Sequence, residues 1–132
     1  MNENPNSAAP ILKGVRLLLV DDSADNQRLF ERILTSVGAE VDLAENGVVA
    51  VARVQATQYD LIIMDIRMPM MDGYEATRRI RDLGFTGPIV ALTAHANPGE
   101  QERCLAAGCS GFQLKPINRA GLLLAVTEAL GK

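Results

Sequence analysis

The sequence predicts an α/β fold in which five helices cover both faces of a doubly wound parallel sheet of five strands. Five short apolar runs alternate strictly with five longer stretches of helical spacing. The apolar runs are almost continuous, a pattern typical of strands that are buried on both faces of a parallel sheet. The chain has 132 residues, 48% of them hydrophobic, which is enough for one sizeable core, and a second domain is not expected.

The expected strands are the apolar runs themselves. They occupy residues 15–20, 41–44, 61–64, 89–92 and, with a weaker pattern, 112–114. Because the connections between successive parallel strands are right-handed crossovers, the helices between them fall on both sides of the sheet. For a chain of this length the pattern indicates a flavodoxin-like sheet with the strand order 2-1-3-4-5.

The expected helices fill the intervals between these strands. The first ends at Gly38, a residue suited to the left-handed conformation that terminates helices, and either Ser23 or Asp25 could cap its start. Its apolar stripe consists of Leu29, Phe30, Ile33, Leu34 and Val37. The other four helices are expected at residues 46–55, 74–83, 98–107 and 118–130.

Composition and charge exclude several classes of protein. Thirteen basic and sixteen acidic residues give a formal net charge of −3, and the basic residues are scattered, so neither nucleic-acid binding nor an anionic membrane face is expected. The apolar runs are too short to cross a bilayer, and the polar start lacks the pattern of a secretion signal. Cys104 and Cys109 form neither a disulfide framework nor a zinc motif, and we interpret them as buried or idle thiols. A cytoplasmic protein without membrane insertion is therefore expected.

The beginning of the chain differs from the rest. Residues 1–13 are mostly polar and contain Pro5 and Pro10, which interrupt any regular pattern. We therefore expect a flexible tail or linker over residues 1–13, followed by one domain over residues 14–132.

Side chains suited to metal or phosphoryl chemistry follow four of the five expected strands. Asp21 and Asp22 follow the first, Asp65 the third, Thr93 the fourth and Lys115 the fifth. In the order 2-1-3-4-5 the first and third strands are neighbours, about 4.8 Å apart. The three carboxylates should therefore converge at the carboxyl edge of the sheet, where doubly wound folds bind their ligands.

This set of side chains indicates a particular chemistry. Three carboxylates that lie close together repel one another unless a cation compensates, and an all-oxygen ligand set favours Mg²⁺. A lysine and a hydroxyl opposite them can bind the oxygens of a phosphoryl group. The sequence therefore predicts a phosphoryl site in which a carboxylate is the nucleophile.

These residues resemble the receiver domains of two-component response regulators. The family's pattern is an acidic pair, an acceptor aspartate, a Ser or Thr, and a Lys-Pro pair, and the resemblance covers about residues 14–132. In LIIMDIRMPMMDG, residues 61–73, Pro69 and Gly73 follow Asp65 by four and eight residues as in the family. ALTA at residues 91–94 and Lys115-Pro116 also fit.

The resemblance implies a magnesium site and a phosphoacceptor. Asp65 would accept the phosphoryl group. Asp22 and Asp65 would bind Mg²⁺ directly, Asp21 would bind it through water, and the backbone carbonyl of Arg67 would complete the protein ligands.

The resemblance also assigns roles to residues on the fourth and fifth strands. Thr93 and Lys115 would bind phosphoryl oxygens, Ala94 would keep space open beside the phosphoryl group, and the Lys115–Pro116 peptide would be cis. His95 and Arg67 would modulate the rate at which the phosphoryl group is hydrolysed. Phe112 would be the aromatic residue that changes position during switching, although a role at the edge of the core carries equal weight.

The resemblance implies a signalling switch that catalyses its own phosphorylation and slow dephosphorylation, and not an enzyme with a separate substrate. The donor would be a histidine kinase or a histidine phosphotransfer domain. The segments at residues 72–81 and 88–95 look most like receivers of hybrid sensor histidine kinases, and a free-standing regulator is the other possibility. Because the sequence ends soon after the fifth helix, we expect the output to be a partner that binds the fourth helix, fifth strand and fifth helix.

Two other functions are compatible with parts of this pattern. The first is a pseudoreceiver that keeps the fold but is not phosphorylated, against which the complete set of residues argues. The second is a magnesium-dependent phosphohydrolase with an aspartyl-phosphate intermediate. Such enzymes usually carry a second aspartate two residues after the nucleophile, where this chain has Arg67.

Overall fold

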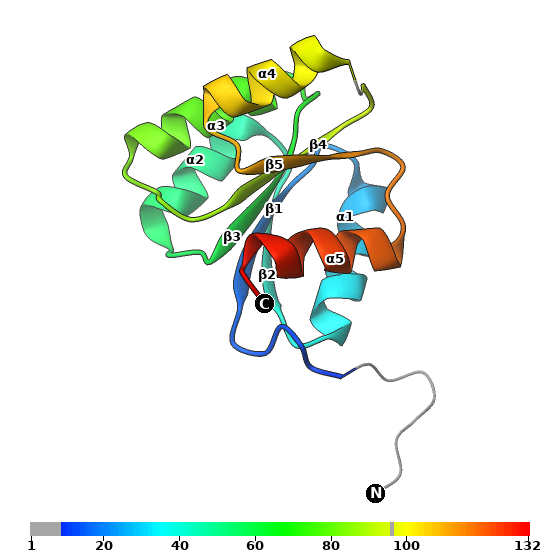
Figure 1. Cartoon of the computed structure of the whole chain (residues 1–132). Coiled ribbons are helices and arrows are strands. Elements are labelled where there is room, and N and C mark those ends of the chain that lie inside the picture. The colour runs from blue at the N-terminus through cyan, green and yellow to red at the C-terminus, as the bar shows by residue number, and fades with distance from the viewer. Residues whose placement is uncertain (1–8, 96) are drawn as a thin grey trace, which may run out of the picture.

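The computed structural model describes residues 9–95 and 97–132. Strands and helices alternate along this part of the chain, and the strands form one parallel sheet in the order β2-β1-β3-β4-β5, as the sequence predicted (Figure 1). The elements are β1 (Arg16–Val20), α1 (Ala24–Ser36), β2 (Glu40–Ala44), α2 (Gly47–Ala56), β3 (Leu61–Asp65), α3 (Gly73–Asp82), β4 (Ile89–Thr93), α4 (Pro98–Ala107), β5 (Gly111–Leu114) and α5 (Arg119–Ala129).

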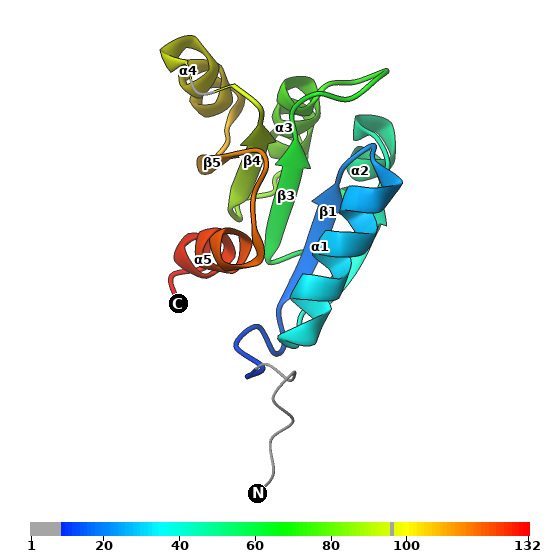
Figure 2. The ribbon, with the colours of Figure 1, turned by 90° about the vertical axis from the view of Figure 1, so that its right-hand side faces the viewer.

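The helices form a layer on each face of the sheet. Helices α1 and α5 lie on one face, and α2, α3 and α4 lie on the other (Figures 1 and 2). Successive residues of a strand point to opposite faces, so Leu17 and Leu19 of β1 pack in the core beside α1 and α5. Leu18 and Val20 pack in the core on the other face. The central strands β3 and β4 are buried throughout, whereas the edge strands β2 and β5 are half-buried. The prediction that every strand is buried on both faces is therefore wrong for β2 and β5.

Each helix begins at a side-chain cap that accepts a hydrogen bond from the backbone of the first turn. The caps are Ser23, Asn46, Asp72, Asn97 and Asn118. Of the two candidates for α1, Ser23 is therefore the cap. In the part of the chain that the structure describes, no helix is both long enough and apolar enough to cross a membrane.

Two expectations about the first part of the domain are corrected. Leu29, which we placed on the apolar stripe of α1, is 52% exposed, because the stripe that faces the sheet is centred on Phe30, Ile33 and Leu34. Leu12, expected in the tail, is fully buried, and its backbone N–H donates to Val37 O at 2.9 Å. An apolar side chain just before β1 thus closes one end of the core beside α1. Residues 1–8 of the expected tail lie outside the described residues.

Candidate functional site

The carboxyl ends of neighbouring strands bring three aspartates together. Val20 of β1 is paired with Met64 of β3, so Asp21 and Asp65 are neighbours across the sheet. One carboxylate oxygen from each of Asp21, Asp22 and Asp65 lies within 4.8 Å of the others. The side chains of Asp21 and Asp65 are buried, and that of Asp22 is exposed. The structure therefore brings the three carboxylates together as the sequence predicted.

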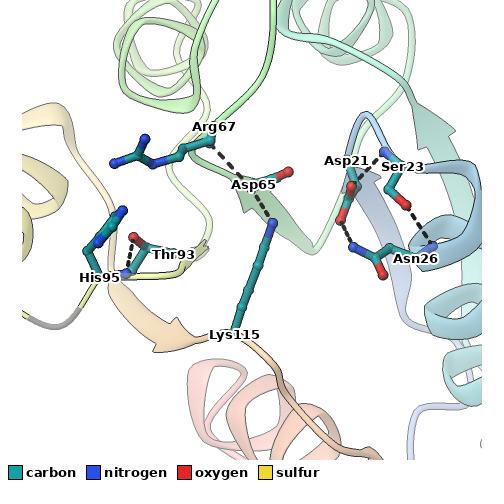
Figure 3. Close-up of polar contacts among 8 residues, drawn as sticks. All are labelled: Asp21, Ser23, Asn26, Asp65, Arg67, Thr93, His95 and Lys115. Atoms are coloured by element: carbon teal, nitrogen blue, oxygen red, sulfur yellow. Dashed lines mark hydrogen bonds and ion pairs between the residues drawn. The ribbon is translucent and has the colours of Figure 1, made fainter.

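Asp65 is the last residue of β3 and lies between Asp21 and Lys115 (Figure 3). Its Oδ1 accepts a hydrogen bond from Lys115 Nζ at 2.7 Å and one from the Arg67 backbone N–H at 3.3 Å. Burial raises the pKa of Asp65, the Lys115 ammonium group opposes this change, and the charge of Asp21 adds to it. One ammonium group thus offsets only part of the cost of holding several carboxylates at this edge.

The second buried carboxylate, Asp21, is held by the start of α1. Its Oδ1 accepts from the Ser23 backbone N–H at 2.8 Å, and its Oδ2 accepts from Asn26 Nδ2 at 3.4 Å (Figure 3). Gln27 Nε2 donates to the carbonyls of Asp21, at 2.7 Å, and Ala44, at 3.3 Å, and so connects the ends of β1 and β2. We did not predict roles for Asn26 and Gln27. Their amides in the first turn after the aspartate pair were the available signal.

Thr93 and Lys115 stand at the carboxyl ends of the next two strands, β4 and β5. Thr93 is the last residue of β4, is 1% exposed, and its Oγ1 accepts from the His95 backbone N–H at 3.2 Å. The backbone N–H of Lys115 donates to Thr93 O at 2.8 Å, which fixes the end of β5 beside β4. The Lys115–Pro116 peptide is cis, as expected from the resemblance.

The loop after β3 is packed tightly against the end of that strand. The Gly73 backbone N–H donates to Ile66 O at 2.8 Å. A Cβ atom on Gly73 would lie 2.4 Å from the Asp65 carbonyl oxygen, so a side chain at this position has no room. Met70, with φ of 70°, is a non-glycine residue in the left-handed region, and its side chain is 80% exposed. The loop geometry therefore depends on Gly73.

The four residues expected to modulate the site are in two environments. Ala94, His95 and Arg67 are exposed around its opening, and the Arg67 side chain extends away from Asp65 (Figure 3). Phe112 is half-buried and packs against the core on the α2, α3 and α4 side of the sheet. Phe112 therefore lies on the face of the sheet that carries α4, outside the polar group around Asp65.

The donor set fits a hard divalent cation. Asp21 and Asp65 are almost fully buried carboxylates, Asp22 reaches solvent, and the side-chain ligands on offer are all oxygen atoms. Burial disfavours the ionised form of Asp65, and a cation at this position would favour it. Among the site residues expected from the sequence, the side chains of Asp21, Asp22 and Asp65 are suited to hold the cation.

Comparisons with known proteins agree with this geometry. Residues 17–127 match the response regulator receiver domain family. A two-component response regulator of Oryza sativa is 44% identical over 119 residues, which cover 86% of this chain and 94% of that protein. The osmosensing histidine protein kinase SLN1 of Saccharomyces cerevisiae is 41% identical over 121 residues, which cover 86% of this chain but 10% of the kinase.

The solved structures that resemble this chain carry the same fold. The receiver domain of a sensor histidine kinase from Pseudomonas aeruginosa, with a magnesium ion coordinated in its active site cleft, superposes with a TM-score of 0.82 at 42% identity and covers 90% of this chain and 99% of that one. The chemotaxis protein CheY4 of Vibrio cholerae superposes with a TM-score of 0.85 at 32% identity and covers 88% and 98%. The chain therefore belongs to the response regulator receiver domain family of two-component signalling.

Proposed function

We propose that this receiver domain accepts a phosphoryl group on Asp65 in the presence of Mg²⁺ and that phosphorylation changes which partner it binds. One observation carries the proposal: carboxylate oxygens of Asp21, Asp22 and Asp65 lie within 4.8 Å of one another, and Lys115 Nζ is 2.7 Å from Asp65 Oδ1. A buried nucleophile, a group of cation ligands and a fixed positive charge are the parts that phosphoryl transfer requires.

The two oxygens of Asp65 are not equivalent in this arrangement. Among the described residues, the hydrogen bonds to its carboxylate come from Lys115 Nζ and the Arg67 N–H, and both go to Oδ1. We assign Oδ2 as the attacking oxygen. A new P–O bond forms at Oδ2 as the P–N bond of the donor's phosphohistidine breaks, and the histidine ring nitrogen keeps the electron pair.

Lys115 and Thr93 would then bind the transferred group. The ammonium group of Lys115 lies beside the nucleophile and can move to a phosphoryl oxygen over a short distance. The Thr93 hydroxyl oxygen accepts from His95 N–H, so its own proton remains available for a phosphoryl oxygen. Ala94, with its small side chain at the opening, leaves room for that group, and the exposed side chains of Arg67 and His95 would control access of water to it.

In the proposed site Asp22, Asp65 and the backbone carbonyl of Arg67 would hold Mg²⁺, and Asp21 would bind it through water. Bound there, the cation would neutralise the charge of the carboxylates and of the phosphoryl oxygens during transfer. The magnesium ion in the related receiver domain from Pseudomonas aeruginosa supports this choice of metal.

The proposed output surface is formed by α4, β5 and α5. Leu105 of α4, Leu114 of β5 and Leu124 of α5 are 64%, 44% and 58% exposed, so this surface offers apolar side chains to a partner. Phe112 on β5 would change its position when Thr93 turns toward the phosphoryl group. The proposed location of the domain is the cytoplasm, and the proposed donor is a histidine kinase or a histidine phosphotransfer domain, in keeping with the kinases among the relatives.

The test is the mass of the intact protein after incubation with Mg²⁺ and acetyl phosphate. Wild type should gain one phosphoryl group, and both Asp65→Asn and wild type with EDTA should gain none. If acetyl phosphate gives no adduct, a phosphorylated histidine phosphotransfer domain is the second donor. Failure with both donors would refute phosphorylation and favour a pseudoreceiver, and sustained release of phosphate from small esters would favour a phosphohydrolase.

A further inference from the structure

Helix α4 is attached to the domain unevenly. Its buried residues are Cys104 and Ala107, and both belong to its second half. No residue of its first half, residues 98–102, is buried, and Glu100 is the one that is half-buried; Arg103, which follows, is exposed. At the other end, the carbonyl of the C-cap residue Gly108 accepts from Arg81 Nε at 2.9 Å. The first half of α4 therefore needs another attachment to keep its place on the domain.

Tyr74 of α3 provides that attachment. Its side chain is 3% exposed, and its hydroxyl donates to Glu100 Oε1. The guanidinium group of Arg103, one turn after Glu100, lies over the Tyr74 ring at 4.1 Å from the centroid. Burial and the neighbouring Glu100 raise the pKa of Tyr74, so the phenol remains a hydrogen-bond donor at neutral pH. Two side chains of α4 thus hold one tyrosine of α3.

Tyr74 is also tied to the phosphoacceptor strand. It directly follows Gly73, whose N–H donates to Ile66 O and on which an added Cβ would lie 2.4 Å from the Asp65 carbonyl oxygen. An open groove of about 500 Å³ between the loop after β3 and α4 is lined by Asp22, Arg67, Tyr74, Glu100 and Arg103 together with four other residues. Because the groove separates the loop from the helix, Tyr74 bridges the two. A shift of either one changes the geometry of this contact.

We propose that Tyr74 is a positioning residue for phosphorylation at Asp65: its contacts with Glu100 and Arg103 hold the first half of α4 in the unphosphorylated arrangement. This inference rests on the proposed function. The contact at Tyr74 occurs together with the bond from Lys115 Nζ to Asp65 Oδ1, and in the proposed transfer Lys115 leaves that bond for a phosphoryl oxygen. When Thr93 turns toward a phosphoryl group, we expect α4, which begins five residues after Thr93, to shift, and the contact at Tyr74 opposes that shift.

The consequence is a defined linkage. A contact that is stronger in one of two states shifts the equilibrium toward that state. Removing the Tyr74 hydroxyl should therefore loosen the first half of α4 and also increase the affinity of Asp65 for a phosphoryl group or its mimic. A purely structural role would loosen α4 without the second effect.

The experiment measures both effects in the full chain. Hydrogen exchange of the amides of residues 101–105 reports the hold on α4, and the affinity for beryllofluoride with Mg²⁺ reports the phosphorylated arrangement. In Tyr74→Phe we expect exchange about tenfold faster, the change given by one lost hydrogen bond to a charged group. Beryllofluoride should also bind several-fold more tightly.

A matched control uses the other tyrosine of the chain. The Tyr59 hydroxyl donates to Asp42 Oδ2 at 2.7 Å, and the Tyr59 side chain is 7% exposed. Tyr59 precedes β3, however, and so lies at the amino end of the strand that carries Asp65 at its carboxyl end. Tyr59→Phe removes the same kind of bond and should change neither measurement. The double variant Tyr74→Phe with Glu100→Gln should resemble Tyr74→Phe alone, because the two side chains act as a pair.

Each outcome decides between the explanations. Faster exchange and tighter beryllofluoride binding in Tyr74→Phe, without either in Tyr59→Phe, would support the inference. Faster exchange with unchanged affinity would overturn it and leave Tyr74 as a structural contact. Unchanged exchange, or equal changes in both tyrosine variants, would overturn it as well. Failure of the proposed function appears separately, in wild type that binds no beryllofluoride and gains no phosphoryl group from either donor.

Discussion

Gly73→Ala is expected to displace α3 from the end of the phosphoacceptor strand. Its Cβ would lie 2.4 Å from the Asp65 carbonyl oxygen and 2.7 Å from Ile66 Cα. Cβ atoms essentially never come within 3.0 Å of such neighbours, and the shortfall to the oxygen is 0.6 Å. The neighbours are backbone atoms of the last residue of β3 and of the residue after it, and the Ile66 N–H is bonded to Leu92 O at 3.1 Å, so a rotamer change cannot relieve the clash.

The size of the effect follows from two opposing contributions. Overpacking against backbone costs up to about 3 kcal/mol of unfolding free energy. Alanine recovers at most about 1 kcal/mol through its higher helix propensity. The net loss is about 2 kcal/mol, which lowers the urea midpoint by about 1 M for a domain of this size. Because the clash includes the Asp65 carbonyl, the rate of phosphoryl adduct formation should also fall in the protein that remains folded.

Gly99→Ala is the matched control for this prediction. Gly99 lies in the first turn of α4, and its added Cβ would be 3.4 Å from Asn97 Oδ1, an ordinary contact. The urea midpoint of Gly99→Ala should equal or exceed that of wild type. The reasoning would be refuted if Gly73→Ala and Gly99→Ala had the same midpoint by circular dichroism and the same rate of adduct formation.

Three further predictions concern the metal site, the titration of Asp65 and the hydrogen bonds of Arg81. Adding Mg²⁺ to about 100 times its dissociation constant should stabilise wild type by about 2.7 kcal/mol in thermal unfolding, and Asp22→Asn should require more Mg²⁺ for the same gain; equal titrations would contradict the ligand assignment. The raised pKa of Asp65 means that the native state holds its proton to a higher pH than the unfolded chain does. Without metal, the contribution of Asp65 to the free energy of unfolding is therefore fully present below the ordinary pKa of an aspartate. It is lost as the pH rises through the pKa of Asp65 in the folded protein. Asp65→Asn should abolish that decline in urea unfolding measured across acidic to neutral pH, and an unchanged pH profile would show that another group is responsible. Arg81 donates to Gly87 O at 2.6 Å and Gly108 O at 2.9 Å, and lysine cannot span both carbonyls, so Arg81→Lys should cost about 2 kcal/mol in urea unfolding; a loss below about 0.5 kcal/mol would argue against this role.

The local pattern of the chain was enough to predict most of the fold. Strict alternation of apolar runs with helical segments determines parallel pairing, because each crossover must return the chain to the same edge of the sheet. The expected and observed elements differ by one residue at several ends, and β3 and β4 end on Asp65 and Thr93 themselves. The errors at Leu12 and Leu29 have a common cause, since periodicity places a residue on a face but does not say which neighbours cover it.

The sequence by itself determined which residues meet at the site. In a parallel sheet the carboxyl ends of all strands lie on the same side. Asp21, Asp65 and Thr93, which stand at the carboxyl ends of neighbouring strands, therefore converge whatever the details of packing. Only the tertiary structure decided how side chains from distant segments touch. The 2.7 Å contact of Lys115 with Asp65 and the bond from Tyr74 to Glu100 depend on sheet twist, helix placement and rotamers, which are set by packing across the whole domain and not by local periodicity.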